Sequence, residues 1–137
     1  MLQKVYLEVK TEFHERVTAS RNAPESATMI RQMWFDMFDF VAAQPRDFLF
    51  LEYGSAAKIL TPEQQSIADG FAEDIAALLK RGADDGTLAP LEPRILSLLL
   101  VAPAMQLARS AVLSGKDIPR DMVEQTFDRV WRAIAAN

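Results

Sequence analysis

The sequence predicts an all-α fold, a six-helix orthogonal or antiparallel bundle, and three observations support this. Apolar residues recur at three- and four-residue steps along most of the chain, which is the period of a helix packed on a core. Prolines and glycines separate these segments, at positions where helices begin and end. The stretch 94–115 is apolar on almost every side, so a helix there needs cover from several neighbours. A second copy of the chain could supply part of that cover.

The composition fits a single globular domain over residues 1–137. Half of the residues are apolar and a quarter are charged, which is ordinary for such a domain. The chain has no cysteine, which excludes disulfide frameworks and thiolate metal sites. The net charge is −4 and no Lys/Arg cluster occurs, so duplex DNA or an anionic membrane would be a poor direct partner.

No stretch of the sequence is expected to enter a membrane. The first residues include charges where a signal peptide needs an apolar run. The run 95–108 is too short to span a bilayer and contains Pro103, so a buried core helix is the better interpretation. We therefore expect a cytoplasmic protein.

The first two helices are predicted from apolar repeats on either side of one break. The first helix covers about 2–20. The second is expected to have Asn22 or Ala23 as its cap and Pro24 in its first turn, and to end near Gln44. Its apolar arc is so broad that we expect it to be covered on two sides.

The third segment, 46–57, is predicted to be a shorter helix. Its Phe-Leu-Phe-Leu run at 48–51 has strand propensity, but no other stretch of the chain offers a partner strand. Gly54 indicates a kink or an early end of this helix.

The fourth helix has the clearest start in the sequence. Thr61 is placed to cap it, Pro62 takes the first helical position and Gln64 completes a capping box. Gly82 and Gly86 are expected to end it.

The fifth and sixth helices complete the predicted bundle. The fifth begins at Pro93 and ends at Gly115. The sixth is expected to have Asp117 as its cap and Pro119 in its first turn. Its apolar stripe includes Phe127.

Residues that carry out catalysis are scarce, and we expect no enzyme, no metal and no cofactor. His14 is the only histidine, which excludes zinc metalloprotease and di-iron motifs, and no Gly-x-Ser-x-Gly elbow occurs. His14 is expected on a helix surface or flank. Asp36 and Asp39 share a face, but that face is otherwise polar, so a solvated surface is the better interpretation.

Large, soft side chains are concentrated in the first five predicted helices. Two interpretations stay open: a plain hydrophobic core, or a cavity for an apolar or aromatic ligand lined by aromatics and adaptable methionines. The candidate ligand-binding residues are Tyr6, Phe13, Met33, Trp34, Met37, Phe38, Phe50, Tyr53, Phe71, Met105 and Gln106.

Four segments resemble the C-terminal, effector-binding and dimerisation domain of TetR-family transcriptional regulators. They are Val-Tyr-Leu-Glu-Val at 5–9, the helix–proline–helix passage 34–50, the helix-ending glycine pair within 78–88, and Thr-Phe-Asp-Arg-Val-Trp-Arg-Ala-Ile at 126–134. The N-terminal helix-turn-helix of that family is missing, because 1–22 is predicted to be one helix. The resemblance therefore implies DNA contact only through a part absent from these residues.

The resemblance also implies how such a domain would work. Two copies would pair through their last two helices, and a small apolar or aromatic effector would bind among the first five. Binding would shift the spacing of the DNA-binding heads, as in a repressor. The implied homodimer interface contains Leu98, Ala102, Arg109, Val123, Phe127, Val130, Trp131 and Ile134.

Two other functions remain as alternatives. The first is a ligand-free helical protein-interaction or dimerisation module with a solid core. The second is a small helical enzyme for an apolar substrate, which lacks a nucleophile–base pair. A large cavity between the first five helices would favour the sensor, and a well-packed interior there would favour the interaction module.

Overall fold

Six helices make up the computed structural model, which describes residues 2–57 and 60–137. Side chains are described at 5–54 and 60–137. The side chain of Leu2, the first residue of the apolar repeat that predicts the first helix, lies outside these ranges. The helices are α1 (Leu2–Val17), α2 (Ser26–Ala43), α3 (Pro45–Ala57), α4 (Pro62–Asp84), α5 (Pro93–Ser114) and α6 (Arg120–Ile134). The described residues form no strand, only one isolated antiparallel bridge between Leu88 and Ala135. The predicted all-α, six-helix fold is confirmed.

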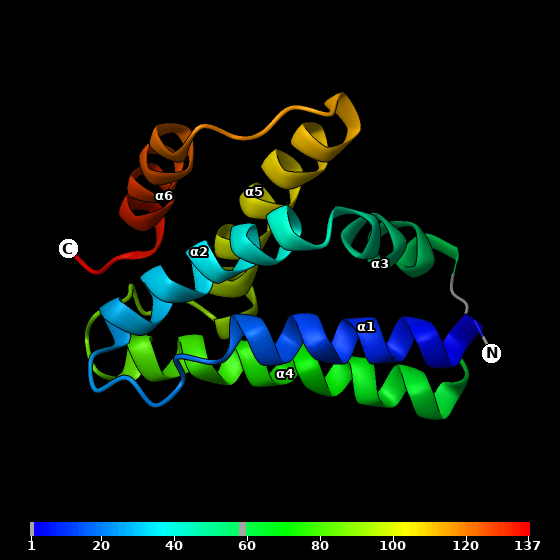
Figure 1. Ribbon diagram of the computed structural model, residues 1–137. Coiled ribbons are helices and arrows are strands. Elements are labelled where there is room, and N and C mark those ends of the chain that lie inside the picture. The colour runs from blue at the N-terminus through cyan, green and yellow to red at the C-terminus, as the bar shows by residue number, and fades with distance from the viewer. Residues whose placement is uncertain (1, 58–59) are drawn as a thin grey trace.

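The helices form two groups, which are joined by α2 (Figure 1). At one end α1 and α4 lie side by side and run in the same direction, with α3 over the first half of α1. At the other end α5 and α6 run antiparallel to each other. Helix α2 contacts the other five helices, so it is the central element of the bundle.

The core is built on α2, as its broad apolar arc predicts. Met29, Ile30, Met33, Trp34 and Phe40 have no exposed surface. The indole Nε1 of Trp34 donates a hydrogen bond to the backbone oxygen of Val123, 3.1 Å away, which ties α2 to α6. This bond satisfies the single polar atom of the indole inside an apolar core.

The connection between α1 and α2 differs from the prediction. Helix α1 ends at Val17, earlier than the expected residue 20, and α2 begins at Ser26 with Glu25 at its N-cap. Neither Asn22 nor Ala23 is the cap. The guanidinium of Arg81, from α4, donates hydrogen bonds to the backbone oxygens of Arg21 and Ala23. These contacts with a distant helix hold the connection in a non-helical path.

The predicted helix ends are confirmed where the signal is local. Thr61 and Gln64 form the complete capping box of α4. Gly115 has φ +70° at the C-terminus of α5, and the N–H of Lys116 donates to the oxygen of Ala111, 3.2 Å away. A left-handed glycine followed by such a bond is a common helix end.

The other predicted ends are confirmed only in part. Helix α4 ends at Asp84 and Gly86 follows its C-cap with φ +84°, as expected, but Gly82 lies inside the helix. A Cβ at Gly82 would lie 2.9 Å from Leu88 Cδ1, so this glycine allows close packing. Helix α3 continues through Gly54, which lies under the ring of Tyr6. The N-cap of α6 is Pro119, not Asp117.

Candidate functional site

Five of the predicted ligand-binding residues lie deep in the core. Tyr6, Met33, Trp34, Met37 and Phe38 are each 7% exposed or less. The Trp34 ring lies 5.2 Å from the Phe38 ring, centroid to centroid. The hydroxyl of Tyr6 donates to the backbone oxygen of Leu51, in α3, at 3.3 Å. These side chains are therefore packed against neighbours in the described conformation.

The remaining predicted residues are spread over several surfaces. Phe13 packs on Phe40, Phe50 meets the Tyr6 ring edge-on, and Phe71 stacks on His14. Met105 is partly buried. Tyr53 is 61% exposed, and Gln106 is exposed as well. The structure therefore does not gather all eleven residues around one space, and their role in ligand binding stays a prediction.

A cavity of about 410 Å³ lies elsewhere, where the ends of α2 and α5 meet the start of α6. Among the predicted ligand-binding residues, only Phe38 lines it. The full lining is Phe38, Asp39, Val41, Ala42, Pro45, Ala111, Val112, Gly115, Lys116, Asp117, Ile118, Arg120 and Val123. Small residues at 42, 111 and 115 leave room between the helices, and none of them is an aromatic residue or a methionine of the kind from which a cavity was predicted.

A group of polar side chains lies at the α1–α4 junction, where His14 and Arg21 both contact Asp74. His14 is less exposed than expected: 11% of its side chain is accessible, and its Nε2 lies 2.8 Å from Asp74 Oδ2. Arg21 also donates to this carboxylate. The hydrogen bond from Arg21, with help from His14, holds the pKa of Asp74 below its ordinary value, against the opposing effect of burial.

A second charged group lies between α1, α3, α4 and α5. Burial lowers the pKa of Lys10, although Glu52 and Asp69 oppose the shift by attraction. Arg109 Nε lies 3.9 Å from Glu52 Oε2, and this Nε is buried without a hydrogen-bond partner. These contacts connect helices and suggest no acid–base chemistry.

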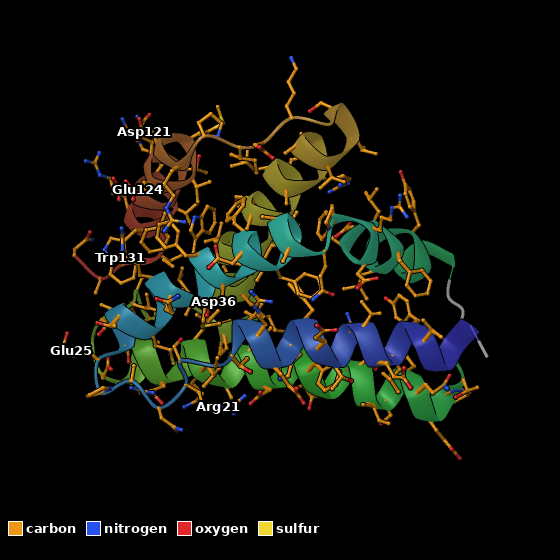
Figure 2. The ribbon with its side chains drawn as sticks, in the orientation of Figure 1. Arg21, Glu25, Asp36, Asp121, Glu124 and Trp131 are labelled. Carbon is orange, nitrogen blue, oxygen red and sulfur yellow. The ribbon has the colours of Figure 1, made fainter. Side chains whose placement is uncertain are left out.

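The predicted dimer-interface residues fall into two groups. Val123, Phe127, Val130 and Ile134 are buried inside the single chain, where they form the inner face of α6. Trp131 is partly buried and packs on Phe127, and Figure 2 shows it on α6 with Asp121 and Glu124, on the side away from α5. Most of the predicted interface residues of α6 are therefore buried in the core of the single chain.

The α5 members of the set lie differently. Leu98 is 64% exposed and Ala102 is exposed, whereas Arg109 is partly buried beside Glu52. Ile95, on the same side as Leu98, is 44% exposed. The opposite side of α5 is buried through Leu96, Leu100, Ala104 and Ala108. We call Ile95, Leu98 and Ala102 the outer row of α5. Gln106 follows on the same side, one helical turn after Ala102.

Helix α5 is also long and apolar enough to cross a membrane by length and composition alone, the only such helix in the part of the chain that the structure describes. We expected the apolar run 95–108 to be too short to span a bilayer. That expectation is wrong about length, because the helix that contains the run has 22 residues. Its inner side packs on α2, α4 and α6, as the core helix of a globular domain does.

Comparison with known proteins gives a family and a fold. Residues 28–135 match the family model "Tetracyclin repressor-like, C-terminal domain". A search of curated proteins gives no significant match.

Three solved structures share the fold. A TetR family transcription regulator from Marinobacter aquaeolei VT8 matches with a TM-score of 0.82 and 18% identity, over 99% of this chain and 72% of that one. A putative TetR family regulator from Shewanella sp. PV-4 matches with 0.79 and 22%, over 99% and 74%. A third, from Vibrio parahaemolyticus, matches with 0.74 and 20%, over 99% and 74%. Since the family model covers most of the chain, the chain belongs to the tetracyclin repressor-like C-terminal domain family of transcription regulators.

Proposed function

We propose that the chain is the effector-sensing and dimerisation domain of a cytoplasmic TetR-like transcription regulator. It would act as a homodimer and bind a small apolar or aromatic effector. DNA contact would be made by a helix-turn-helix outside these 137 residues. The family assignment supports the regulator, and the surface of α5 supports the dimer.

The observation that carries this proposal is the outer row of α5. Its apolar side chains are exposed to solvent, although the opposite side of the same helix is packed against the core. Burying a leucine side chain contributes about 1.5–3 kcal/mol. A second copy that covers Leu98 and its neighbours would therefore gain substantial free energy on association. The partly exposed Trp131 and the exposed Met122 of α6 could extend the contact.

Effector binding among the predicted residues would require the core to open. Tyr6 of α1 is clamped to α3 by its hydrogen bond to Leu51 and by its contact with Gly54. A ligand that enters beside Trp34 and Met37 would favour a state in which α1 and α3 have moved away from α2. Such a ligand shifts the population because it binds the open state more tightly than the closed one. Displacement of α1 would then be transmitted to the DNA-binding part.

The dimer is tested by Leu98→Glu, with Ile67→Glu as the matched control. Ile67 is 50% exposed near the start of α4, so both variants place a carboxylate on an exposed apolar site. We expect Leu98→Glu to weaken the dimer at least tenfold in sedimentation equilibrium while the control keeps the wild-type mass. Equal dimer masses for wild type and Leu98→Glu would disprove this interface.

The ligand-free interaction module remains the second candidate, because five of the residues expected around an effector are buried in a packed core. The two functions differ in a thermal-shift screen with neutral and charged aromatic compounds. A sensor gains stability from a bound effector, and the gain rises with the logarithm of the ratio of free ligand to Kd. A dimer whose melting temperature responds to no compound would favour the interaction module.

A further inference from the structure

The cavity at the ends of α2 and α5 is present without any movement of the core. Its volume of about 410 Å³ falls within the range of small-molecule sites, about 300–1,000 Å³. Three parts of the chain form most of its wall: the last turns of α2, the last turns of α5 with the following loop, and the first turn of α6. Pro45, at the start of α3, completes it. A concave space shared by three elements fits a small molecule better than a protein surface.

Apolar side chains supply much of the lining of this cavity. Phe38 and Val41 come from α2, Val112 from α5, and Ile118 and Val123 from the loop and α6. Val123 is fixed in place because its backbone oxygen accepts the Trp34 hydrogen bond. Contacts with such a wall favour an aromatic or aliphatic body in the ligand.

The charged residues of the lining balance one another. Asp39 and Asp117 carry two negative charges, and Lys116 and Arg120 carry two positive ones. Arg120 is partly engaged already, because its guanidinium lies 4.2 Å from the centroid of the Phe35 ring and its Nε lies 3.9 Å from Glu124 Oε1. The lining therefore carries no net charge that would select an anion or a cation.

Backbone donors at the end of α5 are also occupied. The N–H of Gly115 donates to the oxygen of Val112, and the N–H of Lys116 donates to the oxygen of Ala111. Both donor–acceptor distances are 3.2 Å. A ligand in this cavity would therefore gain more from apolar contact than from hydrogen bonds to this turn.

We propose that this cavity is a binding site for a small, uncharged aromatic molecule, separate from the core site of the proposed function. The occupant would bridge α2, α5 and α6 without opening the core. Because the two sites share only Phe38, either proposal can be disproved while the other still holds.

The test uses three naphthalene probes of nearly equal size and different charge. They are naphthalene-2-carboxamide, naphthalene-2-carboxylate and 2-naphthylmethylammonium, titrated into the 137-residue chain by calorimetry. We expect one amide per chain, bound at least fivefold more tightly than either ion. No binding of the amide, or tighter binding of an ion, would overturn the proposal.

Two variants fill the cavity from opposite walls, Ala42→Trp from α2 and Ala111→Trp from α5. Each should weaken amide binding at least tenfold, while Ala77→Trp, at an exposed position on α4, should leave it unchanged. Ala42 is exposed, so its variant decides the result if Ala111→Trp does not fold. Binding that survives Ala42→Trp but is lost in Met37→Ala would place the ligand in the core and contradict the cavity site.

Discussion

Helices α2 and α5 are both strongly apolar, yet the fold treats them differently. Ten of the 18 residues of α2 are buried, against four of the 22 residues of α5. Helix α2 lies in the middle of the bundle (Figure 1) and contacts all five other helices, whereas the outer row of α5 is exposed to solvent. Composition therefore did not decide which helix is enclosed.

The difference assigns separate roles to the two helices. A helix whose large apolar side chains are covered by its own chain stabilises the monomer. A helix with one bare apolar side has capacity left for a partner, because exposed apolar patches often mark interaction surfaces. The following experiments test this division, from the largest expected effect to the smallest.

The strongest test compares truncations in α2 and α5. Trp34→Ala removes a fully buried ring and its hydrogen bond to Val123, so we expect the free energy of unfolding to fall by about 3–5 kcal/mol. Leu98→Ala should change it by less than about 0.5 kcal/mol at concentrations where the chain is monomeric. Urea unfolding measures both. Similar losses in the two variants would remove the distinction between the helices.

A charge in the inner face of α6 extends the same comparison. Phe127→Glu would place a carboxylate in the core of one chain, since Phe127 is 4% exposed. We expect insoluble or unfolded protein, because an unpaired buried charge costs several kcal/mol. Leu98→Glu should give soluble, folded monomers. Circular dichroism and light scattering separate these outcomes, and a folded Phe127→Glu monomer would contradict the packing of α6.

Gly54 and Gly70 both lie inside helices, one against another helix and one in open space. Substitution by alanine adds a single methyl group at each position. An added Cβ at Gly54 would lie 2.5 Å from ring atoms of Tyr6, whose hydroxyl is tied to Leu51. We expect Gly54→Ala to lower the free energy of unfolding by about 1–2 kcal/mol. Gly70 has no heavy atom within 4 Å of such a Cβ, so Gly70→Ala should raise it by up to about 1 kcal/mol. Thermal unfolding that ranks the two variants in the opposite order would contradict the packing of α1 on α3.

The smallest effect concerns the polar junction below α2. The folded pKa of Asp74 is lowered, chiefly by Arg21, from an unfolded value of about 3.9. Its contribution is therefore complete above pH 3.9 and is lost as the pH falls through the lower folded value. Asp74→Asn should flatten the decline in stability over that window. Asp84→Asn, in an exposed pair with Lys80, is the control, and equal acid profiles for Asp74→Asn and wild type would contradict the assignment.

Local features of the sequence were enough to predict the six helices and some of their ends. The capping box at Thr61 and the left-handed turn at Gly115 involve only residues a few positions apart, so their signals survive without tertiary context. The breadth of the apolar arc of α2 likewise predicted that this helix is covered on two sides. The glycines at 54 and 82 were misread because their reason lies in Tyr6 and Leu88, which approach only when helices pack.

The sequence by itself determined that α5 has too little polar surface for a helix on the outside of a globule. Only the tertiary structure decided which side is bare: Leu96 and Leu100 face the core, and Leu98, between them, faces water. It also placed a cavity beside small residues rather than among the large aromatics. The reason is physical, since burial and empty space depend on the distances between helices, and no local pattern specifies those distances.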